Sequence, residues 1–285
     1  MTQRKVIEVR PAQPSRDGDG VAIARIVGMG HAGMDPILML DELRSTSRED
    51  FIGGFPPHPH RGMQTLTYMK RGGIIHQDSQ GNRGEIRGGG AQWMSAARGV
   101  IHSEMPTPDT GELHGFQIWV NLPAVQKMAE PQYRDVPEAE LSHLEGAGFR
   151  ASAIAGHWDF GPGGEVTGPL QVLAEVAGLL DLQLAPGASV ELALADQENV
   201  LAYVYDGAIA TRDGSQPAGR MLVTSAGDRW PLTAGEQGAG LILLRGIPLR
   251  EPIAHYGPFV MNTSEEIEQA IRDYQEGRLG VAPAA

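Results

Sequence analysis

Short apolar runs separated by turn residues recur along this chain and constrain its fold most strongly. Four of them fill the stretch from residue 170 to residue 205, at 170–176, 179–184, 189–194 and 200–205, and Gly, Pro, Asp or Asn separates each run from the next. Runs of this length with such boundaries are typical of strands joined by tight turns. The 285 residues include 38 glycines and 20 prolines, which favours the same interpretation. We therefore predict an all-β fold built from two sandwiches or barrels.

An acidic and irregular stretch divides the chain near its middle. It extends from residue 123 to residue 150 and contains three prolines and five acidic residues. We interpret it as a linker, because strand-like patterning stops where it begins and resumes after it. The expected division is an N-terminal domain over residues 1–140 and a C-terminal domain over residues 141–285.

One helix is predicted, close to the C-terminus. Thr263 and Glu266 form a capping box, in which each side chain can satisfy a backbone amide at the start of a helix. Apolar residues follow at positions 267, 270, 271 and 274, with the spacing of one helix face, and Gly277 supplies the stop. We expect this apolar face to pack on one of the two domains.

Charge and composition exclude several classes of function. The formal net charge of -12 disfavours direct binding to nucleic acid, which relies on Lys and Arg neutralising phosphates. The chain has no cysteine, so disulfides and thiolate metal sites are excluded. We expect no membrane-spanning segment, because no apolar run approaches 18 residues. The first ten residues lack the apolar core of a signal peptide, so a cytoplasmic location is expected.

Two pairs of polar residues indicate a metal site. His58 and His60 are two residues apart, as are His102 and Glu104, and side chains at this spacing share one face of a strand. Pro56, Pro57 and Pro59 favour an extended edge segment around the first pair. Two such pairs on adjacent strands would bring three imidazoles and one carboxylate together. This donor set suits Fe(II), Mn(II), Co(II), Ni(II) or Zn(II), and the residues alone leave that choice open.

Other polar residues could support those ligands. His76 and Asp78 also share a strand face, so we expect them to form a hydrogen-bonded pair near the site, with His76 buried rather than bound to the metal. Gln64 falls on the same face as His58 and His60 if no bulge intervenes, and Gln117 could donate a hydrogen bond. The isolated histidines of the second half, His157 and His255, are interpreted as structural or surface residues.

Five separated motifs, in this order, resemble those of the pirin family of the cupin superfamily. They are His58-Pro-His-Arg-Gly62, Gln92-Trp-Met94, Gly99-Val-Ile-His-Ser-Glu-Met-Pro106, Gln117-Ile-Trp-Val-Asn-Leu122 and Gly257-Pro-Phe-Val-Met-Asn-Thr263. The resemblance spans nearly the whole chain. It implies two tandem cupin (jelly-roll) β-barrel domains, with one metal in the N-terminal domain and none in the C-terminal domain. It also implies His58, His60, His102 and Glu104 as the metal ligands, and iron as the usual metal.

The resemblance implies two kinds of function. Some pirins are quercetinases, which open the central ring of flavonols with dioxygen, and here Glu104 would serve as general base if its metal bond is weak. Other pirins are metal-dependent regulators that bind protein partners. We favour the interpretation that this protein is an enzyme, with a flavonol-like substrate and O2. The alternative is a regulator that binds a protein partner. A third interpretation, a purely structural site, would require a closed four-ligand zinc centre. One departure is Gln64, which replaces the glutamate usual in the first cupin motif.

Overall fold

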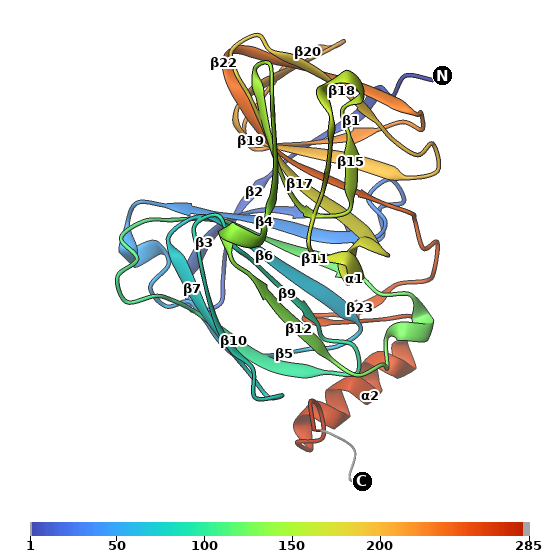
Figure 1. Ribbon diagram of the computed structural model, residues 1–285. Coiled ribbons are helices and arrows are strands. Elements are labelled where there is room, and N and C mark those ends of the chain that lie inside the picture. The colour runs from blue at the N-terminus through green and yellow to red at the C-terminus, as the bar shows by residue number, and fades with distance from the viewer. Residues whose placement is uncertain (1, 282–285) are drawn as a thin grey trace. The chain divides into compact units, whose positions relative to one another are not determined.

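The computed structural model describes residues 2–281. Strands make up 57% of the chain and helices 10%, which confirms the predicted all-β class (Figure 1). Within residues 2–281, no helix has the length and apolar character needed to span a bilayer. The short 3-10 helices are η1 (Arg48–Asp50), η2 (Ala124–Gln126), η3 (Glu138–Glu140) and η4 (Gly161–Gly163).

Two sheets enclose the first core. The four-stranded sheet has the order β5 (Phe55–His60), β10 (Val100–Pro106), β7 (Gly73–Asp78) and β8 (Arg83–Arg87). The seven-stranded sheet has the order β12 (Gln132–Val136), β9 (Ala91–Ser95), β6 (Met63–Arg71), β11 (Leu113–Asn121), β4 (Ile37–Ser45), β3 (Val21–Val27) and β2 (Gln13–Asp17). Buried side chains from both sheets pack together, for example Ile74 and Ile86 with Met69 and Leu113. Burial of this apolar surface holds the two sheets face to face.

A second, eleven-stranded sheet builds the other core. Its main path is β1 (Val6–Pro11), β21 (Arg220–Thr224), β19 (Asn199–Thr211), β22 (Arg229–Gly246), β17 (Ala177–Leu184), β14 (Phe149–Ala155) and β13 (Ser142–Gly146). The strands off this path are β15 (His157–Asp159), β16 (Glu165–Thr167), β18 (Ser189–Ala193) and β20 (Gly214–Pro217). Trp158 and Trp230 are almost fully buried in this core, together with leucines of β17 and β22.

The chain ends in a hairpin and a helix. Strands β23 (Ala254–Tyr256) and β24 (Phe259–Met261) pair with each other, and helix α2 (Ser264–Gln275) follows. The predicted capping box is confirmed: the Thr263 side chain accepts a hydrogen bond from the backbone N–H of Glu266, and the Glu266 carboxylate accepts one from the backbone N–H of Thr263. The buried face of α2 packs with β24, with Leu279 and with Ile101 of β10.

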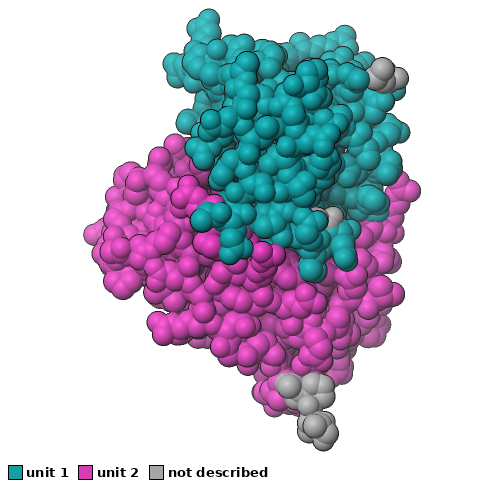
Figure 2. Space-filling view, viewed as in Figure 1, with its two compact units in different colours: residues 1–13, 31–37, 139–248 teal, residues 14–30, 38–138, 249–285 magenta. Residues whose placement is uncertain are grey.

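The compact units differ from the predicted continuous domains 1–140 and 141–285. One unit consists of Met1–Gln13, His31–Ile37 and Ala139–Pro248, and the other of Pro14–Gly30, Leu38–Glu138 and Leu249–Ala285 (Figure 2). The break near residue 138 lies close to the predicted boundary. Each end of the chain belongs to the unit opposite to the one predicted. Strand β1 pairs with β21 in the second core, whereas α2 packs against β10 in the first.

Two local expectations were wrong. The run 170–176 contains the short helix α1 (Gln171–Ala174) instead of a strand, and its Val172 is exposed. The stretch interpreted as a linker contains β12 and β13. Their acidic composition hid them, because both strands have one largely exposed face. They are edge strands whose formation depends on pairing with β9 and β14.

Candidate metal centre

Three histidines converge between two paired strands. His58 and His60 lie on β5 and His102 on β10, and the antiparallel register places His102 opposite His58. One ring nitrogen from each residue lies within 4.8 Å of the other two. His60 and His102 are buried, each only 2% exposed. Gly62, with φ of 82°, ends the extended segment by turning the chain toward β6. The parity of the two strands therefore brings these three predicted residues together.

The histidine site favours neutral rings with bare nitrogens. Burial, followed by the proximity of His58, holds the pKa of His60 well below its usual value, although a hydrogen bond with the backbone of Pro258 acts in the opposite direction. Burial also holds the pKa of His102 well below its usual value, with His60, His58 and His76 adding to the effect. Nδ1 of His60 and Nε2 of His102 are buried without a hydrogen-bond partner. Neutral imidazoles with unpaired lone pairs are suitable ligands for a divalent metal, so these residues fit one.

Glu104 lies beside the histidines in a hydrogen-bonded setting. It is 5% exposed and lines the same cavity as His58 and His60, but it is not part of the three-histidine group. Its Oε1 accepts a hydrogen bond of 2.9 Å from Thr67 Oγ1, and Thr67 Oγ1 also lies 2.5 Å from Gln117 Oε1, an atom that the NH2 group replaces when the amide is turned over. A hydroxyl has one proton, so both contacts are satisfied together when Gln117 presents its NH2 group to Thr67. The predicted donor role of Gln117 is compatible with this chain of contacts.

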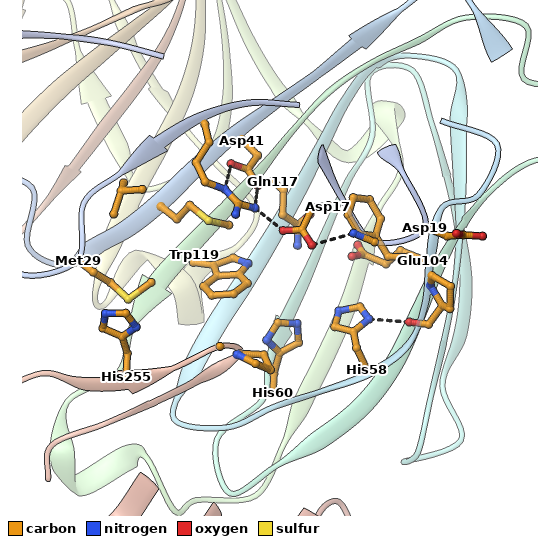
Figure 3. Close-up of a pocket in the computed structure, with 18 residues that line it drawn as sticks. Asp17, Asp19, Met29, Asp41, His58, His60, Glu104, Gln117, Trp119 and His255 are labelled. Atoms are coloured by element: carbon orange, nitrogen blue, oxygen red, sulfur yellow. Dashed lines mark hydrogen bonds and ion pairs between the residues drawn. The ribbon is translucent and has the colours of Figure 1, made fainter. Parts of the chain in front are cut away.

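A cavity of about 730 Å³ opens at this site. Figure 3 shows His58, His60 and Glu104 along its wall, with Trp119 beside His60 and Met29 beside His255. The T-shaped contact between His60 and Trp119 has ring centroids 5.2 Å apart. The cavity has a volume typical of small-molecule sites, and its apolar side chains can exclude water.

An ion-pair cluster forms the polar wall of the cavity and was missed by the sequence analysis. Arg25 donates to Asp41 Oδ1 at 2.8 Å and Oδ2 at 2.6 Å, and to Asp17 Oδ2 at 2.5 Å (Figure 3). The hydrogen bond with Asp41 is the main cause of a raised pKa of Arg25, whereas burial raises the pKa of Asp41. His255 is exposed, in agreement with its interpretation as a structural or surface residue, and it also lines the cavity. No spacing in the sequence connects residues 17, 25, 41 and 255.

A buried polar network lies behind His102. The predicted pair is confirmed: His76 Nε2 lies 3.1 Å from Asp78 Oδ2, and both side chains are 1% exposed. His76 Nδ1 lies 3.3 Å from His102 Nδ1. Tyr133 covers the His76 ring, with centroids 4.6 Å apart. Burial raises the pKa of Asp78, but hydrogen bonds from His76 and Asn82 outweigh it, so the net shift is downward.

Gln64 lies on a different sheet from the first histidine pair. It belongs to β6, is 2% exposed, and accepts a hydrogen bond of 2.7 Å from Trp93 Nε1. It is not among the residues that line the cavity. The alternation of faces that links His58 and His60 does not continue to Gln64, because the turn at Gly62 intervenes.

The segment that follows His60 is fixed by residues distant in sequence. Arg61 donates to the carbonyl of Arg98 at 2.6 Å and to Asp273 of α2 at 2.8 Å. The buried Lys127 donates to the carbonyls of Gly62 at 2.7 Å and Val260 at 3.0 Å, and to Asn121 Oδ1 at 2.6 Å. The C-terminal segment therefore helps to hold the first histidine pair in place.

Comparisons with known proteins agree with this fold and site. The pirin family model matches residues 21–120, and the model of the pirin C-terminal cupin domain matches residues 179–280. A Vibrio cholerae protein named as a candidate quercetin 2,3-dioxygenase is 46% identical over 277 residues, which cover 97% of this chain and 98% of that protein. A Pseudomonas aeruginosa protein with the same type of name is 43% identical and covers 98% of this chain and 99% of its own length. The crystal structure of a quercetin 2,3-dioxygenase from Acinetobacter baumannii superposes with a TM-score of 0.87 at 29% identity, covering 97% of this chain and 98% of that one.

Fold and site together define a protein with two cupin-type domains and a group of three histidines able to bind a metal. The extent and identity of the sequence matches make the family assignment specific. The chain belongs to the pirin family.

Proposed function

We propose that this protein is an iron-dependent dioxygenase that opens flavonol-like substrates with O2. The observation that carries the proposal is the group of three histidines, two of which, His58 and His60, lie with Glu104 on the wall of one largely apolar cavity. The names of the Vibrio, Pseudomonas and Acinetobacter proteins support the same reaction class. The proposed ligands are His58, His60, His102 and Glu104, with one Fe(II) per chain. Iron bound here would lower the pKa of a substrate hydroxyl and leave positions for substrate and dioxygen.

The protein side chains would orient the substrate. Met29, Met39 and Trp119 provide apolar walls for a planar aromatic molecule. Asp17 and Arg25, on the polar wall of the same cavity, can accept and donate hydrogen bonds to hydroxyl groups of that molecule. A hydroxylated aromatic substrate matches this mixture of surfaces better than a purely apolar one.

Glu104 is the proposed general base. Thr67 holds one of its carboxylate oxygens, so the other would receive the proton of the substrate hydroxyl if its bond to the metal is weak. Gln117 would orient Thr67 and thereby fix the rotation of the carboxylate. Thr67→Val should therefore reduce turnover while leaving the metal content near one per chain.

The test combines elemental analysis with turnover. Protein prepared without chelator should contain about one iron per chain, and His58→Ala should lose it. His157→Ala is a matched control, because His157 is an exposed histidine of the other unit, hydrogen-bonded to Thr167. Iron-loaded protein should consume O2 with a flavonol, and not with the flavone that lacks the 3-hydroxyl group.

Absence of iron-dependent loss across a flavonol series would refute the proposed substrate class. Zinc or no metal in the isolated protein would contradict iron as the resident metal. The regulator alternative stays a prediction, and retention of a protein partner that chelator abolishes would favour it.

A further inference from the structure

The residue in contact with His102 does not by itself determine which of the two ring nitrogens of His102 carries the proton. At His58 the matter is simple: Nδ1 faces the carbonyl of Pro56 at 2.8 Å, and a carbonyl only accepts, so Nδ1 carries the proton. At His102 the partner is another imidazole. Nδ1 of His102 and Nδ1 of His76 are 3.3 Å apart, and either could donate to the other.

Asp78 resolves this ambiguity. Its Oδ1 accepts hydrogen bonds from the backbone amides of Gln80 at 2.9 Å and Asn82 at 3.0 Å. Its Oδ2 accepts from Asn82 Nδ2 at 2.9 Å and lies 3.1 Å from His76 Nε2. Both oxygens are therefore occupied as acceptors, and His76 must donate from Nε2. A neutral His76 then has a bare Nδ1, which can only accept.

We propose that the Asp78–His76 pair fixes the tautomer of His102, so that Nε2 of His102 is free to bind the metal. In this arrangement Nδ1 of His102 donates to Nδ1 of His76, which leaves Nε2 without a proton. Nε2 of His102 is indeed buried without a hydrogen-bond partner. His76 and Asp78 are thus positioning residues, and the inference rests on the proposed ligand set.

The network is rigid enough to act in this way. The His76 side chain is 1% exposed, and the ring of Tyr133 covers it at an interplanar angle of 30°. The turn that begins at Asp78 is tied to β10 by two hydrogen bonds between Ser79 and Ile101. Gln80 Nε2 donates to the carbonyl of Gly280 at 2.6 Å, which fixes the turn from the other side. The carboxylate therefore keeps its direction toward His76.

Substitution of Asp78 by Asn should move the ring protons of His76 and His102 to their other nitrogens. The new NH2 group cannot face the two backbone amides at Oδ1, because these groups only donate. It must take the Oδ2 position, where His76 Nε2 can become an acceptor and Asn82 can turn its amide. The proton of His76 then moves to Nδ1, and His102 must carry its own proton on Nε2, the proposed ligand atom.

The first measurement is the tautomer in metal-free protein. Long-range proton–nitrogen correlation spectra distinguish protonated from unprotonated ring nitrogens. We expect a proton on Nδ1 of His102 in the unsubstituted protein and on Nε2 in Asp78→Asn. A proton on Nε2 of His102 in the unsubstituted protein would overturn the inference.

The second measurement is Ni(II) affinity, determined by competition with a chelating dye. His76→Phe keeps the ring volume but removes the acceptor, and both it and Asp78→Asn should weaken binding by about 10–100-fold. Tyr133→Phe is the matched control: it keeps the ring over His76 and removes only the hydroxyl group, which donates to Asp135 and accepts from Gln92, so its affinity should stay within about twofold. Equal affinity of Asp78→Asn and the unsubstituted protein would overturn the inference even if His76→Phe fails to fold. Failure of the unsubstituted protein to bind Ni(II) would instead contradict the proposed ligand set, and neither readout depends on turnover.

Discussion

Lys127 should make the protein more stable as the pH rises above 8. Its side chain is 1% exposed, and its Nζ is surrounded by the oxygens of Gly62, Asn121 and Val260 rather than by a carboxylate. Burial lowers the pKa of Lys127 to about 8, despite the more distant charges of Glu251 and Glu266. The unfolded chain restores the ordinary value of 10.5.

The magnitude follows from this difference. Between pH 8 and pH 10.5 the unfolded chain binds a proton at Lys127 that the folded protein has released, so the free energy of unfolding rises with pH across this window. Below pH 8 both states are protonated, and the stability gained in the window is absent. The difference between the pKa of Lys127 in the unfolded chain and in the folded protein corresponds to about 3 kcal/mol.

Urea unfolding at intervals from pH 7 to pH 10.5 measures the effect. Other groups titrate in the same range, so the relevant quantity is the difference between the unsubstituted protein and Lys127→Met. That difference should change by about 3 kcal/mol across the window. Lys5→Met, which alters an exposed lysine, should show no comparable change. A difference that stays flat, or that changes with the opposite sign, would refute the assignment of a charged, poorly solvated Lys127.

Three other perturbations test the structure around the site. Asp273→Ala should lower the free energy of unfolding by about 3 kcal/mol, because it leaves the buried Arg61 without its ion-pair partner. Urea unfolding measures this loss. A loss below about 0.5 kcal/mol, which is typical of substitutions at surface sites, would contradict the prediction. Thr263→Ala should cost about 1 kcal/mol by the same measurement, because it removes the cap of α2, whereas Thr263→Ser should cost little. Chelation should lower the free energy of unfolding by about 2.7 kcal/mol relative to protein held with metal at about 100 times its Kd. Thermal unfolding should show this difference in the unsubstituted protein and not in His58→Ala.

The parts of the site that could be predicted depend on local geometry. Alternation of side chains along a strand relates His58 to His60 and His76 to Asp78 without knowledge of the fold. The same rule fails at Gln64, because a turn and a change of sheet separate it from His60. The prediction was therefore reliable within a strand and unreliable across its ends.

The cavity walls could not be predicted because they depend on pairing between distant segments. Arg25 reaches Asp41 because β3 pairs with β4, which places the two residues opposite each other. His255 reaches the cavity through the C-terminal hairpin. Neither the pairing of Arg25 with Asp41 nor the position of His255 produces a periodic pattern in the sequence. No short-range preference of the residues specifies these contacts either.

The same limit explains why the predicted domain division differs from the compact units. The stretch after Pro123 is acidic and was therefore interpreted as a linker, but Tyr133 lies in it and packs on His76. A polar composition indicates only that a segment is exposed to solvent. An edge strand with one exposed face therefore has the composition of a loop. Only the pairing of β12 with β9 reveals that this stretch belongs to the unit that holds the site.

The C-terminal segment is structurally part of the histidine site, although it follows that site by about two hundred residues. Arg61 directly follows His60, and its guanidinium group is neutralised by Asp273 of α2. Lys127 joins Gly62 to Val260 of β24, so the turn after the first histidine pair is fixed to the terminal hairpin. Gly280 accepts the hydrogen bond that steadies the turn behind His76. Because segments 38–138 and 249–281 both contribute to these contacts, residues 1–140 alone would lack the groups that orient the histidines.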